Sequence, residues 1–258
     1  KPPNIPDPDG AVPTMAEPFS LPAHTSVVVI GGTGGIGSAI ARQFLDLGAQ
    51  VTITGASDRD IATCGLADTP GVTCAVLDVT DDAAMVAFAD GIARVDVLVN
   101  CAGILRRDAE YDIKTFRQVI DVNLTGTFSA CIAFRARLAE TQGAIINIAS
   151  MNAERALPRL PGYCASKAGV VMVTRALSHA WAPDGIRVNA VAPGFIETEL
   201  NAEGRADRAH YDRIADRTAL KRWGLPEDVA GAVVFLAMPA ARYVTGSVYA
   251  VDGGFLAS

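Results

Sequence analysis

The sequence lacks a long apolar run. Hydrophobic residues make up 50% of its 258 positions, but no stretch approaches the roughly 18 residues that span a bilayer, and no signal-peptide pattern is present. A nucleic-acid partner is also not expected, because the net charge is −6 and phosphate binding depends on clustered Lys and Arg. We therefore expect a soluble protein that binds neither membranes nor nucleic acids.

Cysteines are few and lack the spacing of a structural site. Their number is odd and no CxxC pair occurs, so neither a disulfide framework nor a zinc site is expected. We expect no metal and a cytoplasmic location, where thiols stay reduced. The five cysteines are Cys64, Cys74, Cys101, Cys131 and Cys164.

The first 22 residues hold seven of the fourteen prolines. Such a segment can neither form a ladder of backbone hydrogen bonds nor bury much surface. We interpret residues 1–22 as a mobile arm and residues 23–258 as one folded domain. Met15 fits a natural start behind an added leader, with a native extension as the alternative.

Beyond the arm, short apolar strands alternate with amphipathic helical segments. Continuous Val- and Ile-rich runs are typical of strands covered on both faces, and therefore of a parallel sheet. The sequence predicts the α/β class and a single domain with a Rossmann-type, doubly wound parallel sheet of about seven strands. The predicted strands span residues 27–30, 51–54, 74–79, 96–100, 144–150, 186–193 and 247–251.

A glycine-rich turn follows the first predicted strand and opens the first helix. Gly31, Gly35 and Gly37 allow a sharp turn, and Ile36 lies between the last two. A backbone without side chains can approach a pyrophosphate closely, and a helix N-terminus offers unpaired N–H groups to its oxygens. The placement between strand and helix favours a dinucleotide site over the alternative, a glycine-rich turn without a ligand.

Further candidate cofactor residues follow two other strands. Asp78 and Val79 lie at the end of the third predicted strand, and Asn100, Ala102 and Gly103 follow the fourth. In an open parallel sheet, ligands bind outside the carboxyl ends of the strands. We expect all of these residues to line one crevice with the glycine turn.

The motifs together resemble those of the short-chain dehydrogenase/reductase family. They are GxxxGxG, NxAG after the fourth strand, a serine thirteen residues before YxxxK, and PG after the next strand, within residues 24–258. Two positions depart from the family pattern: Ile30 replaces a threonine and Cys101 a second asparagine. The resemblance implies an NAD(P)(H)-dependent oxidoreductase that interconverts a secondary alcohol and a ketone by hydride transfer, and a homo-oligomer, commonly a tetramer.

The serine, tyrosine and lysine of these motifs suit proton transfer. In a helix expected to begin near Tyr163, Tyr163 and Lys167 are one turn apart. An ammonium near a phenol is expected to lower its pKa from about 10. Ser150 ends a predicted strand and is expected to hydrogen-bond the substrate oxygen. By resemblance, Lys167 also holds the nicotinamide ribose, and Asn123 is the fourth catalytic position, at a helix kink with a proton-relaying water. Singly, these residues also fit a solvated helix face or a cap.

The PG segment follows the sixth predicted strand. By resemblance, Pro193 belongs to the cofactor site, and Ile196 and Thr198 contact the nicotinamide carboxamide. The alternative is a plain turn that ends the strand.

The choice between NAD and NADP is open. An acidic residue at the end of the second strand usually binds the adenosine ribose, but Gly55 stands there. Asp58 would suit the ribose hydroxyls, whereas Arg59 or Ser57 would suit a 2′-phosphate. We favour NAD(H), because the glycine loop has Gly34 where NADP-binding loops often have a basic residue, and NADP(H) is the alternative.

Arginines mark the expected substrate region. Arg106 and Arg155, with Arg107 and Arg159 beside them, lie in loops that enclose the substrate in the family, together with Ser150. Guanidinium groups suit carboxylates, so a sugar acid or polyol is expected, unless these side chains only form a solvated rim. A 3-oxoacyl thioester reductase and a nucleotide-sensing regulatory protein are the alternatives. Residues 199–222 are expected to form a mobile lid.

Overall fold

Seven parallel strands form the sheet at the centre of the fold. The computed structural model describes residues 17–257, and the strand order is β3-β2-β1-β4-β5-β6-β7. The order reverses direction between β1 and β4, which is where ligands bind in doubly wound sheets. The strands are β1 (Ser26–Ile30), β2 (Gln50–Gly55), β3 (Val72–Val76), β4 (Val97–Asn100), β5 (Ala144–Ile148), β6 (Arg187–Pro193) and β7 (Val248–Val251).

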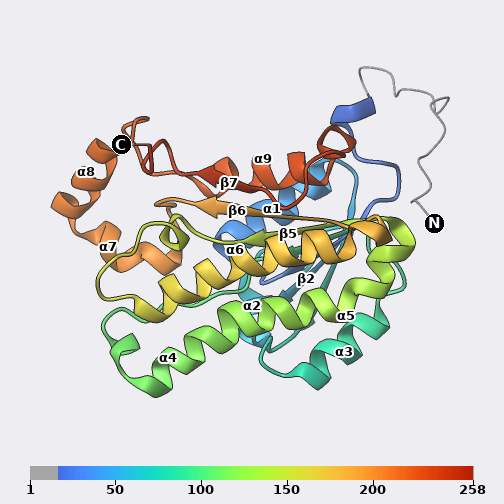
Figure 1. The fold of residues 1–258 in the computed structure, drawn as a ribbon, viewed down its shortest axis with the longest axis horizontal. Helices are drawn as coiled ribbons and strands as arrows, with labels where there is room; N and C mark the ends of the chain where they lie inside the picture. The colour runs from blue at the N-terminus through green and yellow to red at the C-terminus, as the bar shows by residue number, and fades with distance from the viewer. Residues whose placement is uncertain (1–16, 258) are drawn as a thin grey trace.

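Helices cover both faces of the sheet, as Figure 1 shows. Helices α1 and α9 pack on one face, and α3, α5 and α6 pack on the other. The short helices α7 and α8 lie beyond the end of the sheet toward which the β6 arrow points. The helices are α1 (Gly35–Asp46), α2 (Asp58–Thr63), α3 (Asp82–Gly91), α4 (Ile113–Ile120), α5 (Gly126–Thr141), α6 (Pro161–Trp181), α7 (Ala202–Ala206), α8 (Arg208–Arg217) and α9 (Pro226–Ala237).

Alternate residues of each central strand contribute to two separate cores. In β1, Val27 and Val29 pack with Phe44 of α1, whereas Val28 packs with Phe134 of α5 on the opposite face. All five side chains are fully buried. Because successive side chains of a strand point to opposite faces, a strand that is apolar throughout needs helices on both sides. The predicted fold class is confirmed.

Three details differ from the sequence interpretation. The third strand spans Val72–Val76 rather than residues 74–79, because Val72 pairs with Val51 directly after the turn at Gly71. The catalytic-motif helix begins at Pro161, two residues before Tyr163. Leu21 packs against the core, so residues 17–22 of the expected arm contact the domain; residues 1–16 lie outside the described part.

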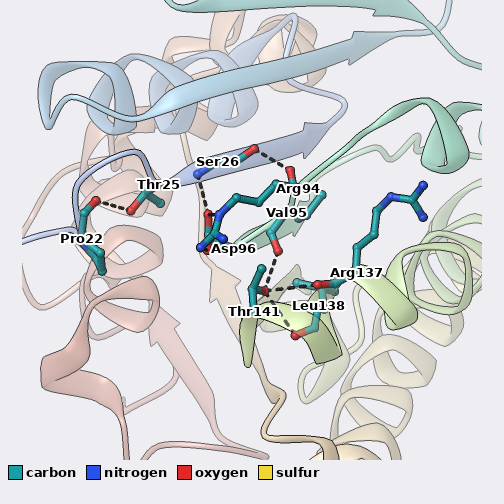
Figure 2. Close-up of polar contacts among 9 residues, drawn as sticks. All are labelled: Pro22, Thr25, Ser26, Arg94, Val95, Asp96, Arg137, Leu138 and Thr141. Atoms are coloured by element: carbon teal, nitrogen blue, oxygen red, sulfur yellow. Dashed lines mark hydrogen bonds and ion pairs between the residues drawn. The ribbon is translucent and has the colours of Figure 1, made fainter.

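Polar contacts fasten the amino ends of the central strands, opposite the glycine turn. Figure 2 shows Asp96, just before β4, accepting a hydrogen bond from the backbone N–H of Ser26 at 2.8 Å. The Ser26 hydroxyl donates to the carbonyl of Arg94, also at 2.8 Å, and Thr141 at the end of α5 donates to Val95 at 2.7 Å. These contacts join the amino ends of β1 and β4 to each other and to the end of α5.

Within residues 17–257, no helix combines the length and the apolar character needed to cross a membrane. The same residues contain no cluster of His, Cys, Asp or Glu side chains arranged to hold a metal ion.

Candidate active site

A cavity of about 530 Å³ opens at the carboxyl ends of the strands. Segments that follow six of the seven strands contribute to its wall, as expected for a ligand site at the point where the strand order reverses. The wall includes these residues predicted from the sequence: Gly31, Gly35, Ile36, Asp78, Val79, Ala102, Gly103, Arg106, Ser150, Tyr163, Lys167, Pro193, Ile196 and Thr198.

The glycine turn is shaped by close backbone contacts. Gly31 has φ +80°, and a Cβ there would lie 2.6 Å from the backbone nitrogen of Ala102. A Cβ on Gly37 would lie 2.1 Å from the Gly31 carbonyl oxygen, so Gly37 lets α1 pack on the turn and is not part of the cavity wall. Gly34 begins α1 without a side-chain cap, which leaves N–H groups of the first turn available to a phosphate. This cradle fits a dinucleotide.

Asn100 differs from its predicted role. Its side chain donates to Asn147 Oδ1 on β5 at 2.8 Å and contacts Cys131 Sγ on α5 at 3.3 Å. Asn147 in turn donates to Thr174 of α6 at 2.9 Å. Asn100 therefore links β4 to β5 beneath the cavity, and its side chain is not part of the cavity wall.

Ser150, Tyr163 and Lys167 lie together at the cavity wall. The Ser150 hydroxyl is hydrogen-bonded to the Tyr163 phenol. Lys167 Nζ lies 5.7 Å from the centre of the Tyr163 ring and donates to the Ile148 carbonyl at 2.8 Å. The serine that ends β5 and the first turns of α6 thus meet as the spacing of the motifs predicts.

The protonation states differ from the sequence-based expectation. Burial raises the pKa of Tyr163 to about 12, although the hydrogen bond from Ser150 lowers it. Burial also lowers the pKa of Lys167 to about 8. The expectation of a lowered tyrosine pKa does not hold for this arrangement, because burial of the phenol outweighs the opposing contributions and the Lys167 ammonium donates to a backbone carbonyl rather than to the phenol. At neutral pH the phenol holds its proton and can donate it to a nearby oxygen.

Asn123 lies in a π-helical turn, Asp121–Thr125, between α4 and α5. Helix kinks commonly occur at such π-helical turns. Its side chain accepts from the N–H of Ile104 at 2.7 Å and donates to the Ile104 carbonyl at 2.8 Å and to Ser166 at 3.1 Å. Asn123 fixes the loop after β4 behind the cavity wall, and its part in a water-mediated relay stays a prediction.

The segment after β6 closes the cavity against the glycine turn. A Cβ on Gly35 would lie 3.1 Å from the Thr198 side chain, so the two cofactor segments touch. Glu197 accepts a hydrogen bond from Tyr211 of α8 at 2.8 Å and pairs with Arg205 of α7 at 3.5 Å. The residues expected to form a lid are thereby tied to this segment, and Leu200 lines the cavity.

Of the four arginines singled out in the sequence, only Arg106 lines the cavity. The exposed Arg155 guanidinium lies 5.9 Å from the ring centre of Phe255. Arg159 forms a two-pronged ion pair with Asp108, with Nε to Oδ1 at 2.8 Å. Arg106 is the arginine that can meet a substrate in this cavity.

Sequence reasoning missed two acidic residues near the site. Asp60, in the first turn of α2, lines the cavity and forms reciprocal hydrogen bonds with Ser57. The spacing of Ser57 and Asp60 matches a capping box, so the sequence contains a signal for Asp60, whereas the expected ribose ligand, Asp58, is not part of the cavity wall. Glu110 is 1% exposed. Its contact with Tyr163 joins positions 53 residues apart, and no spacing rule predicts such a contact.

Comparisons with known proteins agree with this geometry. The family model described as enoyl-(acyl carrier protein) reductase matches residues 31–256. A galactitol 2-dehydrogenase (L-tagatose-forming) of Cereibacter sphaeroides is 43% identical over 239 residues, which are 88% of this chain and 93% of that protein. A 3-oxoacyl-[acyl-carrier-protein] reductase of Rickettsia bellii is 35% identical over 234 residues, 90% of this chain and 96% of its own.

A solved structure is also similar over nearly the whole chain. It is described as an NAD(P)-dependent gluconate 5-dehydrogenase of Beutenbergia cavernae with bound NADP at low occupancy. Its TM-score is 0.87 at 40% identity, with coverage of 93% of this chain and 100% of that one.

The doubly wound sheet, the glycine cradle and the Ser150–Tyr163–Lys167 group define a nicotinamide-dependent oxidoreductase that acts on CH–OH groups. More specifically, the chain belongs to the short-chain dehydrogenase/reductase family, whose model and relatives match it almost end to end. The predicted family and enzyme class are confirmed.

Proposed function

We propose that the protein interconverts a secondary alcohol and a ketone of a sugar acid, with NAD(H) as its preferred cofactor. One observation carries the substrate class: Arg106 lines the same cavity as Ser150 and Tyr163. A guanidinium suits a carboxylate, and the hydroxyl and phenol suit an alcohol or ketone oxygen. The similarity to a galactitol dehydrogenase and a gluconate dehydrogenase supports a polyhydroxylated substrate.

In the proposed reaction, the glycine turn and the segment from Pro193 to Thr198 would hold the dinucleotide, and its nicotinamide ring would supply the hydride acceptor or donor. Tyr163 donates its phenolic proton to the substrate oxygen during ketone reduction and takes it back during alcohol oxidation. Ser150 donates a hydrogen bond to the same oxygen, where negative charge develops. Lys167 carries positive charge below its pKa of about 8 and stabilises the phenolate after the transfer.

The preference for NAD(H) rests on the charges of the cavity wall. On the side proposed to take the adenosine, the first turn of α2 and the segment after β3 contribute Asp60 and Asp78. The basic residues of the wall, Arg106 and Lys167, come from the segment after β4 and from α6, and β4 lies on the other side of β1 from β2 and β3. Carboxylates repel a 2′-phosphate and accept hydrogen bonds from ribose hydroxyls. The NADP in the Beutenbergia cavernae structure favours the alternative.

Replacing Asp60 tests this preference. Asp60→Asn keeps the shape of the side chain but removes its charge, so we expect kcat/KM for NADP to rise about tenfold relative to NAD, or about 1.4 kcal/mol. Asp58→Asn is the matched control, because Asp58 lies on the same helix but outside the cavity wall. A wild-type enzyme that already prefers NADP, or equal effects of the two variants, would contradict the NAD(H) proposal.

Replacing Arg106 tests the substrate class. Loss of a charge-assisted hydrogen bond costs about 1.5–3 kcal/mol, so Arg106→Gln should raise KM for D-gluconate at least about tenfold. KM for galactitol, which carries no charge, should change little. Arg107→Gln is the control, because Arg107 is not part of the cavity wall. Steady-state kinetics with both substrates measures the difference.

A 3-oxoacyl thioester reductase is the second candidate, favoured by the similarity to the Rickettsia bellii enzyme. A substrate panel of sugar acids, polyols and 3-oxoacyl thioesters separates the two. Turnover of the thioesters alone would refute the sugar-acid proposal.

We further propose a cytoplasmic homo-oligomer, most simply a tetramer. Large apolar side chains are exposed on α5 and α6, namely Phe128, Ile132 and Met172. Such exposed residues are typical of surfaces covered by a second subunit. A monomeric mass in light scattering would contradict the oligomer.

A further inference from the structure

Glu110 is a buried carboxylate between two parts of the candidate active site. It belongs to a short 3₁₀ turn, Ala109–Tyr111, and is 1% exposed. Its Oε2 accepts a hydrogen bond from the backbone N–H of Tyr163 at 2.9 Å. Its Oε1 accepts one from the backbone N–H of Arg106 at 2.8 Å. One carboxylate therefore contacts the residues proposed to transfer the proton and to bind the substrate anion.

On the α6 side, Glu110 supplies a cap that the helix does not make for itself. Leu160 precedes α6 and offers no capping side chain, and Pro161 has no N–H group. The N–H of Tyr163, in the first turn, would lack a partner without the carboxylate. A negative charge also interacts favourably with a helix N-terminus. The orientation of Tyr163 at the start of α6 thus depends on Glu110.

The fit around the carboxylate is close. A Cβ on Gly162 would lie 3.4 Å from Glu110 Oε2 and 3.2 Å from Phe116 Cδ2. Glycine before Tyr163 therefore leaves room for the carboxylate against the helix, so the helix start and Glu110 are matched in shape.

On the Arg106 side, two hydrogen bonds close a tight loop. In addition to the contact of Oε1, the backbone N–H of Glu110 donates to the Arg106 carbonyl at 3.1 Å. Glu110 therefore holds both peptide groups that flank the Cα of Arg106, one through its N–H and the other through its carbonyl. Glu110 thus fixes the backbone of Arg106 relative to that of Tyr163. The Arg106 side chain, which lines the cavity, extends from this fixed backbone.

We propose that Glu110 is a positioning residue, which holds the proton-transferring Tyr163 and the anion-binding Arg106 at a fixed separation. The inference rests on the proposed function, in which these two residues act on the same substrate. Glu110 does not line the cavity and acts through its two neighbours. Substrates that span the oxygen to be reduced and a carboxylate need this fixed separation.

The charge of Glu110 also acts on Tyr163. Burial is the main cause of the raised tyrosine pKa, and the ionised forms of Cys164, Cys101 and Glu110 add to it. The ammonium of Lys167 lies over the ring. Loss of the carboxylate charge should favour the phenolate, whereas loss of a purely structural cap would leave the phenol unchanged.

Glu110→Gln is the test, because it keeps the shape and removes the charge. The amide can accept only one of the two N–H groups and directs its own N–H₂ at the other. We expect kcat with D-gluconate to fall about tenfold or more, by misplacement of Tyr163. We also expect the ratio of ionised to neutral Tyr163 at a fixed alkaline pH to rise about threefold. The ultraviolet difference spectrum of tyrosinate, referenced to Tyr163→Phe, measures this ratio without any substrate.

Asp112→Asn is the matched control. Asp112 lies in the same segment and caps α4 through the N–H of Thr115 at 2.9 Å, but has no bond to Tyr163 or Arg106. We expect wild-type ionisation of Tyr163 in this variant. Equal tyrosinate ratios in the Glu110 and Asp112 variants would overturn the inference and leave the proposed function intact, whereas turnover by Tyr163→Phe would refute the proposed function itself.

A second variant separates charge from position if Glu110→Gln does not fold. Glu110→Asp keeps the charge but is one methylene shorter, so it reaches only one of the two N–H groups. We expect wild-type ionisation of Tyr163 and a kcat that is again reduced. A wild-type kcat for Glu110→Asp would overturn the positioning role.

Discussion

Tyr163→Phe is expected to lower kcat by about 10²–10⁴-fold, the usual contribution of a general acid or base. The variant keeps the ring and loses only the hydroxyl, which is hydrogen-bonded to Ser150 at the cavity wall. Ketone reduction then has no proton donor at the substrate oxygen, and alcohol oxidation has no acceptor. Binding of NADH, followed by its fluorescence, should remain, because the glycine cradle is untouched.

The pH dependence of alcohol oxidation provides a second test of the role of Tyr163. Alcohol oxidation needs the phenolate, and the pKa of Tyr163 is raised to about 12, so the rate should increase with pH across the neutral and mildly alkaline range. The residual rate of the variant should lose this increase. Tyr243→Phe is the control, since Tyr243 is fully exposed. Wild-type turnover by Tyr163→Phe would refute the proposed mechanism.

The sequence was sufficient to predict the architecture because its central strands are mainly apolar. β4 and β5 are buried at every position, and such strands need cover on both faces. The third strand was placed two residues too late because it lies beside only β2 in the sheet. Its side chains are intermediate or exposed, so burial leaves little trace of its bounds in the sequence.

Local motifs predicted the positions of site residues better than their physical roles. Gly37 and Asn100 lie next to the site as expected, but one allows helix packing and the other links two strands. The charge of Lys167 was expected to lower the pKa of Tyr163, whereas burial of the phenol dominates. Burial and backbone partners arise from tertiary packing, which spacing along the chain does not encode.

The arginines also show that the sequence predicts the position of a residue better than its physical role. Arg106 and Arg159 carry the same chemistry and lie in neighbouring loops, yet Asp108 binds one of them and leaves the other to the cavity. Asp108 and Arg159 both have positive φ, 61° and 77°, and the backbone N–H of Asp108 donates to the Arg159 carbonyl at 3.0 Å, which joins the two loops. Which arginine faces the substrate depends on this pairing across fifty-one residues of sequence.

Gly37→Ala is expected to destabilise the fold more than an ordinary glycine substitution. The new Cβ would lie 2.1 Å from the carbonyl oxygen of Gly31 and 3.0 Å from the Cα of Gly32. Both obstacles are backbone, so α1 or the turn must move. Overpacking of this kind costs about 3 kcal/mol, which corresponds to a fall in Tm of roughly 6–12 °C for a chain of this size. Thermal unfolding measures the loss.

Gly34→Ala is the matched control, three residues earlier in the same turn. A Cβ there meets nothing within 4 Å, and Gly34 has φ −142°, which alanine adopts readily. Its free energy of unfolding should stay within about 0.5 kcal/mol of the wild type. If movement of the turn is the cause, displacement of Gly31 should also weaken cofactor binding. Because a ligand stabilises the folded state in proportion to its binding, added NADH should raise the melting temperature of Gly37→Ala less than that of the wild type. Equal melting temperatures for the two variants would show that a Cβ at the contact of α1 with Gly31 does not lower the free energy of unfolding.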